Sequence, residues 1–276
     1  MPHSPAYLLV FHGSRDPRSQ AAAIGLTELF RQRIQYVGHP ALLGDRSGSP
    51  ANYAGFVASG FGLPTLADAE PEPSTVPLVG TAFLECTPIP LHQQIAEFIR
   101  TQEITALRVL PVFLSPGVHV MEDIPTEVAI AQQTLAGTVT IDMAPYLGTH
   151  TRLRRLLTER MSLLPMSAWI LMAHGSRRPG ANTAIDAVAD HLGAVAAYWL
   201  TPPSLQSRLE ELQQVGCRTV GILPYFLFPG GTTDAIAETL AELSPQFPDL
   251  QLHLTPPLEA SPELADLLIE LATRPL

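Results

Sequence analysis

The chain has 276 residues, of which 46% are hydrophobic and 15% charged; its formal net charge is −10, and it contains no lysine. This balance is typical of a globular protein with a full core, and the acidic surface argues against non-specific nucleic-acid binding. Two cysteines, Cys86 and Cys217, cannot supply a disulfide framework, a cysteine-rich metal site or an iron–sulfur centre.

The first residues, MPHSPAYLLVFHGS, lack the basic region that begins a signal peptide. No apolar run approaches the roughly 20 residues that a membrane helix needs. We therefore expect a soluble, cytoplasmic protein.

The first half of the chain alternates apolar runs with amphipathic segments. Strands are predicted at Tyr7–Phe11, Leu78–Leu84, Leu107–Leu114 and Val139–Ala144. Helices are predicted at Ser19–Gln35, Leu91–Arg100, Thr126–Leu135 and Thr151–Met161. Tyr36–Pro77 is rich in Gly, Pro, Ala and Ser and has no clear period. It predicts a long surface insertion, of the kind that includes partly mobile lids.

The second half repeats the first in three phrases that occur in the same order. LLVFHGSRDPRSQ, with His12, matches WILMAHGSRRPGAN, with His174, at an offset of 162 residues. VLPVFLSPG matches ILPYFLFPG at an offset of 113, and MAPYLGTHTRLRRLL matches LTPPLEASPELADLL at 111. Strands are predicted in this half at Ala168–Ala173, Ala194–Leu200, Thr219–Phe228 and Leu250–Leu254. The pattern indicates two homologous lobes, residues 1–163 and 164–276.

Alternating strands and helices imply βαβ units. We therefore expect an α/β fold in which each lobe has a mainly four-stranded parallel sheet with helices on both faces. Ligands of such sheets bind at the carboxyl ends of the strands. His12 and His174 both stand where a strand ends.

Three side chains of the first lobe are candidates for chemistry. His12 ends the first strand, Glu85 in AFLECTP ends the second, and His119 follows the third after a Pro-Gly turn. Two imidazoles and a carboxylate suit a divalent first-row metal, and the same groups can accept protons near neutral pH. The alternatives are structural: a backbone contact for His12 and a cap or ion pair for Glu85.

The neighbours of these residues have simpler interpretations. Asp16 and Pro17 read as the N-cap and first residue of a helix. Glu122 and Asp123 either contribute to the site or are acids that complement a helix dipole. Strand alternation from Glu85 points Cys86 to the other face of the sheet, which predicts a core position.

The second lobe keeps only part of this set. Aligning the repeats puts Thr232 opposite His119 and Leu200 opposite Glu85, while His174 matches a histidine. One complete site per chain follows, with the second lobe as the other wall of its cleft. His174 is either a relic or a ligand contact.

Other catalytic motifs are missing from the sequence. There is no phosphate-binding G-x-x-x-x-G-K-[ST], no full G-x-G-x-x-G fingerprint and no G-x-S-x-G elbow.

The phrases LLVFHGSRDPRSQ, AFLECTP and LPVFLSPGVHVMEDIP, in this order, resemble the sirohydrochlorin chelatases, the class II tetrapyrrole chelatases. The resemblance covers nearly the whole chain, as in the long members that fuse two copies of the short, homodimeric form. The family commonly has Glu-Leu where this chain has Glu85-Cys86, and the Tyr36–Pro77 insertion is unusual.

The resemblance implies insertion of a divalent metal, Co²⁺ or Fe²⁺ (Ni²⁺ in some members), into sirohydrochlorin without ATP, in cobalamin or sirohaem biosynthesis. It implies that His12 and His119 are metal ligands and proton acceptors, assisted by Glu85, and that no cofactor is needed beyond the metal substrate. Arg15 and Arg18 are then candidate anchors for the substrate's many carboxylates, unless they are solvated turn charges. Ser14 is a further candidate contact.

Three other functions stay open. A metal or tetrapyrrole carrier would use the same fold without catalysis, and a protoporphyrin chelatase would want a more apolar, membrane-facing lip. A generic two-lobed binding protein for sugars or nucleotides is the remaining alternative. Pseudo-two-fold pairing of the lobes favours a monomer.

Overall fold

The computed structural model describes residues 6–35 and 77–274. The predicted insertion, apart from its last residue, lies outside the described residues, as does the idea that it forms a lid. No helix in the described ranges is long and apolar enough to cross a membrane.

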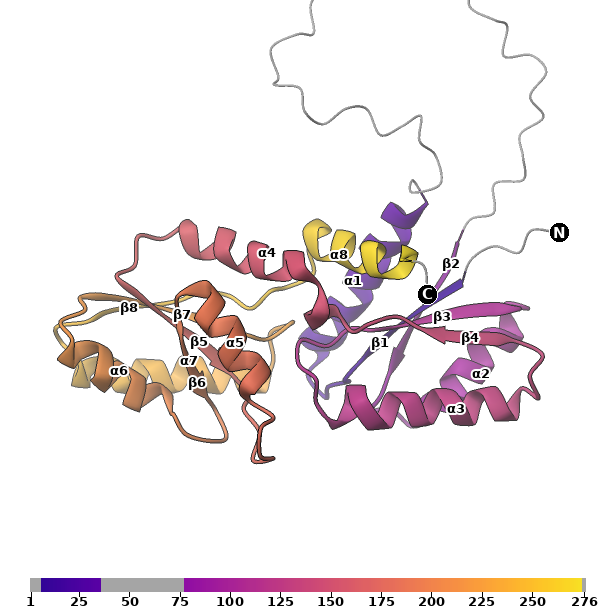
Figure 1. The fold of residues 1–276 in the computed structure, drawn as a ribbon, viewed down its shortest axis with the longest axis horizontal. Helices are drawn as coiled ribbons and strands as arrows, with labels where there is room; N and C mark the ends of the chain where they lie inside the picture. Colours follow the sequence, from indigo (N-terminus) through magenta and orange to yellow (C-terminus); the bar gives the residue numbers. More distant parts are fainter. Residues whose placement is uncertain (1–5, 36–76, 275–276) are drawn as a thin grey trace, which may run out of the picture.

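The first lobe is a four-stranded parallel sheet in the order β2-β1-β3-β4 (Figure 1). Its elements are β1 (Ala6–Phe11), α1 (Pro17–Ile34), β2 (Leu78–Phe83), α2 (Leu91–Thr101), β3 (Ala106–Pro111), the π-helix η2 (His119–Asp123), α3 (Ile124–Thr134), β4 (Thr140–Met143), the 3₁₀ turn η3 (Leu147–Thr149) and α4 (Thr151–Ser162). As predicted, Asp16 caps α1 and Pro17 is its first residue.

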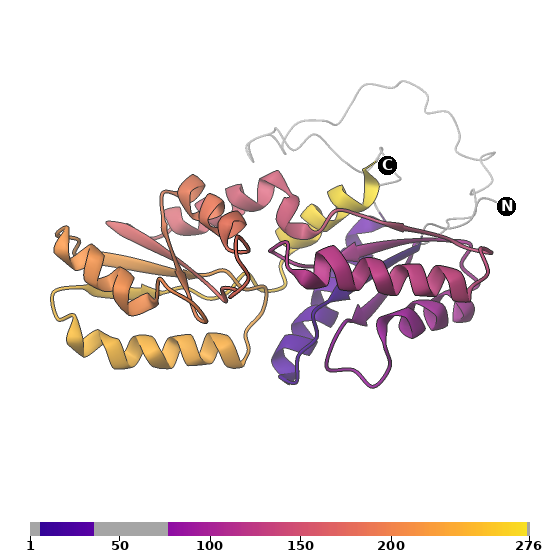
Figure 2. The ribbon, with the colours of Figure 1, turned by 60° about the horizontal axis from the view of Figure 1, so that its bottom comes forward.

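The second lobe has the same topology, with the order β6-β5-β7-β8 and every pair parallel. Its elements are β5 (Ala168–Ala173), α5 (Thr183–Leu192), β6 (Val195–Tyr198), α6 (Leu205–Gln214), β7 (Thr219–Pro224), α7 (Gly231–Leu243), the 3₁₀ turn η4 (Ser244–Gln246), β8 (Gln251–Leu254) and α8 (Pro262–Thr273). The predicted α/β fold with two homologous lobes is confirmed, and the lobes lie side by side (Figure 2).

The strand register reproduces the offsets of the sequence repeat. Leu8 of β1 pairs with Val109 of β3, and Ile170 of β5 pairs with Ile222 of β7. Leu8 and Ile170 are 162 residues apart, and Val109 and Ile222 are 113 apart, which are the offsets of the repeated phrases. The two halves therefore share not only a topology but a residue-by-residue alignment of their central strands.

The central strands are buried on both faces, which explains their continuous apolar sequences. All six residues of β1 are buried. Helices α2 and α3 cover one face of the first sheet, and α6 and α7 cover one face of the second.

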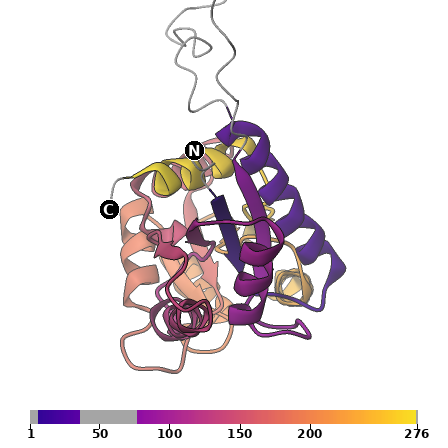
Figure 3. The ribbon, with the colours of Figure 1, turned by 90° about the vertical axis from the view of Figure 1, so that its right-hand side faces the viewer.

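The lobes exchange their last helices. Helix α8, at the end of the second half, packs along α1 of the first lobe, whereas α4 packs against α5 of the second (Figures 1 and 3). Arg33 of α1 makes two hydrogen bonds of 2.6 Å to the Asp266 carboxylate of α8. One continuous apolar core consequently runs through both lobes.

Two predicted strands end early at a proline. The runs Leu107–Leu114 and Thr219–Phe228 leave the strand at Pro111 and Pro224. Proline has no N–H to donate to a ladder, so it favours a strand end. The apolar residues beyond each proline line a cavity instead.

The prediction for Cys86 was wrong. β2 ends at Phe83, so strand alternation no longer applies three residues later. Cys86 adopts φ 56° in the left-handed region, and its side chain is exposed.

Candidate metal centre

Three strand ends of the first sheet bring His12, Glu85 and His119 together. One ligand atom from each lies within 4.8 Å of the others. Nε2 of His12 is 3.9 Å from the Glu85 carboxylate, and Nε2 of His119 is 3.8 Å from it. The sequence had placed each residue at a strand end of one sheet, and the parallel topology makes those ends converge.

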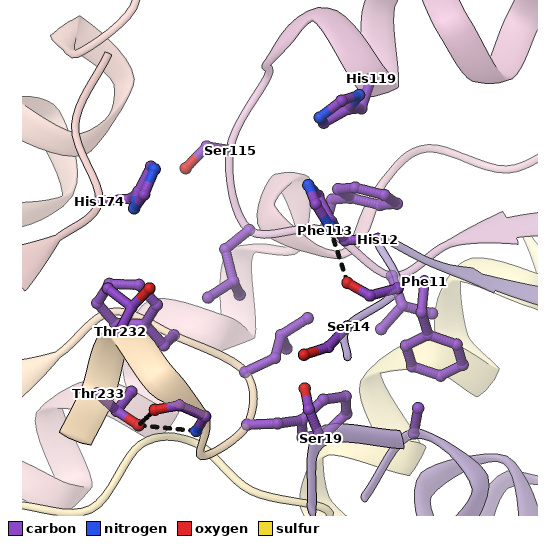
Figure 4. Close-up of a pocket in the computed structure, with 18 of the residues that line it drawn as sticks. Phe11, His12, Ser14, Ser19, Phe113, Ser115, His119, His174, Thr232 and Thr233 are labelled. Atoms are coloured by element: carbon purple, nitrogen blue, oxygen red, sulfur yellow. Dashed lines mark hydrogen bonds between the residues drawn. The ribbon is translucent and has the colours of Figure 1, made fainter. Parts of the chain in front are cut away.

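Both imidazoles are oriented by a bond to Nδ1. Nδ1 of His12 lies 2.9 Å from the carbonyl of Gly13, and Nδ1 of His119 lies 2.7 Å from the carboxylate of Asp123 (Figure 4 shows the first bond). Both partners are acceptors, so each Nδ1 carries the proton and each Nε2 presents a lone pair. These lone pairs face Glu85, which gives a two-nitrogen, one-oxygen set for a divalent metal.

The backbone around Gly13 requires glycine. Gly13 has φ 95°, and a Cβ there would lie 2.0 Å from the carbonyl oxygen of Glu85. This close approach lets the N–H of Glu85 donate to the carbonyl of His12 at 2.8 Å. The missing side chain therefore allows the first and second strand ends to bring their ligands together.

The same contact persists in the second lobe, where a leucine replaces the glutamate. The N–H of Leu200 donates to the carbonyl of His174 at 2.9 Å, which matches the Glu85–His12 bond. The alignment of Leu200 with Glu85 is thus confirmed in space. Among the described residues, only the first lobe assembles a group of three metal-ligating side chains.

A cavity of about 650 Å³ lies between the lobes beside His12 and His119. Its first-lobe wall includes Phe11, Phe83 and Phe113, and its second-lobe wall runs from Tyr225 to Thr233. His174 reaches into it from the second lobe (Figure 4). Apolar walls with a few convergent polar groups are typical of a small-molecule site.

His174 remains a neutral base at this wall. Partial burial, and then the nearby His12, lower its pKa. At neutral pH its imidazole is therefore uncharged. His174 lines the cavity, and whether it is a relic or a ligand contact stays a prediction.

The other predicted site residues differ in their surroundings. Ser14 lines the cavity, and Arg15 next to it is exposed. Arg18 already has two ion pairs: its guanidinium binds Asp16 of its own lobe and Asp234 of the second lobe. These carboxylates raise the pKa of Arg18.

The sequence left one contributor open and did not identify another. Asp123 was either a site residue or a helix acid, and its contact with His119 favours the first; the spacing of four residues is a signal for such a contact within a helix. Phe113, whose ring centroid lies 6.4 Å from those of both His12 and His119, read as part of a strand. Glu122 instead binds Arg178 of the second lobe.

Similarity to known proteins is consistent with this architecture. The CbiX family model matches residues 63–163 and 168–274, one match for each lobe. His12 lies outside both ranges, so its place in the site rests on the geometry.

Two curated relatives and one solved structure are similar to the chain. A sirohydrochlorin ferrochelatase of Priestia megaterium is 25% identical over 61% of this chain and 68% of its own. A sirohydrochlorin cobaltochelatase of Methanococcoides burtonii is 32% identical over 30% of this chain and 68% of its own. SirB from Bacillus subtilis with Fe³⁺ aligns with a TM-score of 0.71 and 20% identity, covering 97% of this chain and 94% of that one.

Proposed function

We propose that this chain, which belongs to the CbiX family, inserts a divalent metal ion into sirohydrochlorin without ATP. The observation that carries the proposal is the orientation of His12 and His119. Their Nε2 lone pairs face one carboxylate, and both histidines line a cavity of about 650 Å³. The names of the two curated relatives support the same substrate.

The donor set fits a metal that must be released again. Two imidazoles and one carboxylate hold a divalent ion while leaving coordination positions open for incoming pyrrole nitrogens. Side-chain exposures of 53% for His12, 32% for His119 and 49% for Glu85 leave the three groups accessible to a ligand. We propose that these residues bind the metal substrate.

Insertion also removes two protons from the macrocycle. As the metal leaves the protein for the pyrrole nitrogens, each pyrrole N–H gives up a proton and the metal–protein bonds break. The freed Nε2 atoms of His12 and His119, or the Glu85 carboxylate, can accept those protons. The metal ion is a substrate here, and no resident cofactor enters the proposal.

The substrate's carboxylates require cations at the cavity. Arg15 follows the cavity-lining Ser14 and makes no ion pair within residues 6–35 and 77–274, so we propose it as an anchor. Arg18 stays a candidate, but a substrate carboxylate would have to displace Asp234 from it. The helix exchange supports the proposal that one chain acts as a monomer, because each lobe already covers the other. A cytoplasmic location stays a prediction.

The proposal is tested by anaerobic absorbance spectroscopy. Sirohydrochlorin is mixed with the protein and Co²⁺, Fe²⁺ or Ni²⁺ in turn, and initial rates are compared with a reaction without protein. His12→Ala and His119→Ala should abolish the acceleration. His253→Ala, which removes an exposed histidine from β8 of the second lobe, should not.

The outcomes separate the alternatives. The metal with the fastest insertion indicates whether iron, cobalt or nickel is preferred. The two relatives differ on this point, since one is named a ferrochelatase and the other a cobaltochelatase. Tight binding of sirohydrochlorin without acceleration by any metal would identify a carrier. Insertion into protoporphyrin but not sirohydrochlorin would overturn the proposed substrate.

A further inference from the structure

The cavity wall carries no permanently charged side chain among the described residues. Its titratable members are Tyr225 and the three histidines His12, His119 and His174, and the rest are apolar residues, glycines, one glutamine, serines and threonines. A substrate with many carboxylates must therefore find its cations at the rim. The overall charge of −10 makes such local cations necessary.

Four arginines lie within two residues of the wall, two on each lobe. Arg15 and Arg18 follow β1, and Arg177 and Arg178 follow β5. Arg18 binds Asp234, and Arg178 donates to Glu122 with both terminal nitrogens at 3.1 Å. Each of these pairs crosses from one lobe to the other. Arg18 and Arg178 are therefore already paired with carboxylates of the protein.

Arg15 and Arg177 differ from their neighbours. Within residues 6–35 and 77–274, neither side chain has an ion pair or hydrogen bond, and both are exposed. They occupy equivalent positions of the repeat, 162 residues apart. Each lobe thus has one exposed arginine, without an ion pair among the described residues, directly after a serine that lines the cavity.

The same hydrogen-bonded turn holds both arginines. Ser14 Oγ accepts from the N–H of Asp16 at 3.1 Å, and Ser176 Oγ accepts from the N–H of Arg178 at 3.2 Å. The arginine is the middle residue of each turn, and each serine lines the cavity. The turn therefore fixes the backbone of Arg177 beside the second-lobe wall as it fixes Arg15 beside the first.

The Arg178–Glu122 pair strengthens this placement. It ties the loop that carries Arg177 to η2, the segment that carries His119. It also neutralises Glu122, which would otherwise repel an anionic ligand at this edge. The second lobe has lost two of three metal-ligand positions but has kept this turn and its arginine.

We propose that Arg177 forms a carboxylate-binding subsite on the second lobe, opposite Arg15, and binds a side-chain carboxylate of the tetrapyrrole. The inference rests on the proposed function, because it takes sirohydrochlorin as the ligand. A guanidinium suits this task, since it is always charged and binds carboxylates with two parallel hydrogen bonds. The subsite raises the affinity for the tetrapyrrole and favours macrocycles that carry many carboxylates.

The test measures binding and turnover separately. Metal-free sirohydrochlorin is titrated into the wild type, Arg177→Gln, Arg177→Lys and Arg218→Gln, and binding is followed by intrinsic fluorescence. Arg218 precedes β7 at the opposite, amino-terminal end of the second sheet, and its side chain is exposed. Arg218→Gln therefore removes the same charge from the same lobe, away from the cavity.

Arg177→Gln should raise Kd and KM about tenfold, the usual loss for one charge-assisted hydrogen-bonded contact, with a much smaller effect on kcat. Arg177→Lys should recover part of the affinity. Arg218→Gln should bind like the wild type. The salt dependence of binding should weaken in Arg177→Gln alone, because one fewer charge contributes.

Failure of this inference is distinguishable from failure of the proposed function. If wild type binds and inserts metal while Arg177→Gln binds equally well, the subsite is overturned alone. If Arg177→Gln loses affinity but no variant or wild type inserts metal, the subsite stands and the catalytic proposal falls. If the wild type does not bind sirohydrochlorin, both are overturned.

Discussion

The carboxylate of Asp123 lies 2.7 Å from Nδ1 of His119, four residues away along η2. It holds the proton on Nδ1 and directs Nε2 at Glu85. Carboxylate partners of this kind orient metal-binding imidazoles and raise their basicity. The π-helix places them together because its wider turn begins at His119 and ends at Asp123.

Replacement of this partner should weaken metal binding. Asp123→Asn keeps the shape but removes the charge, so we expect the affinity for Co²⁺ to fall about tenfold or more. Isothermal titration calorimetry of the tetrapyrrole-free protein measures it. Glu122→Gln is the matched control, since that neighbouring acid binds Arg178 and does not contact His119. Equal affinities for Asp123→Asn and the wild type would contradict the orienting role.

A methyl group at Gly13 should disrupt the metal centre. Its φ of 95° is unfavourable for alanine, and the new Cβ would lie 2.0 Å from the Glu85 carbonyl oxygen. We expect Gly13→Ala to lower the free energy of unfolding by about 2 kcal/mol or more and to impair metal binding. Urea denaturation with a parallel metal titration checks both effects.

Gly25 of α1 provides the comparison for that substitution. Its added Cβ would meet Ala260 at an ordinary 4.0 Å. Gly25→Ala should therefore be neutral or stabilise the helix by up to about 1 kcal/mol. A Gly13→Ala protein as stable as Gly25→Ala, with unchanged metal affinity, would argue against a tight packing of the first two strand ends.

Because the lobes exchange their last helices, folding of the first lobe should depend on the second. Residues 1–163 alone lack α8, whose Leu264, Leu268 and Leu271 are no more than 1% exposed. We expect this fragment not to fold as a monomer, and to gain structure when residues 164–276 are added or when two copies pair. Circular dichroism with analytical ultracentrifugation tests this. A monomeric fragment with a cooperative thermal transition would refute it.

His150 should make stability depend on pH. The side chain is 1% exposed and faces Glu270, Arg152 and Arg274; burial, the dominant cause, lowers its pKa. The unfolded chain therefore binds a proton at this site before the folded one does. The free energy of unfolding should then fall as the pH drops below about 6.5, until the folded pKa is also passed.

His150→Asn isolates this contribution. Nδ1 of His150 accepts from the N–H of Arg152 at the start of α4, and asparagine can replace that cap. Between pH 7.5 and 5, chemical denaturation should show a smaller loss of stability for His150→Asn than for the wild type. Parallel pH profiles for the two proteins would mean that His150 titrates alike in both states.

Local sequence was enough to predict the strands and the strand ends that carry the site residues. The apolar run Ala168–Ala173 is β5 to the residue, and His12 and Glu85 follow strands as expected. A run buried on both faces can only be a central parallel strand here, and its carboxyl end points to the ligand edge. The repeat also fixed which residues of the second lobe would correspond, as the Leu200–His174 bond demonstrates.

Contacts between the two lobes were decided only by the tertiary structure. Arg18 finds Asp234, 216 residues away, and α8 covers the first lobe rather than its own. Neither result has a local signal, because both depend on how two similar sheets pack and which apolar face remains uncovered. Local periodicity specifies which face of a helix is apolar, whereas the position of every other element determines what that face meets.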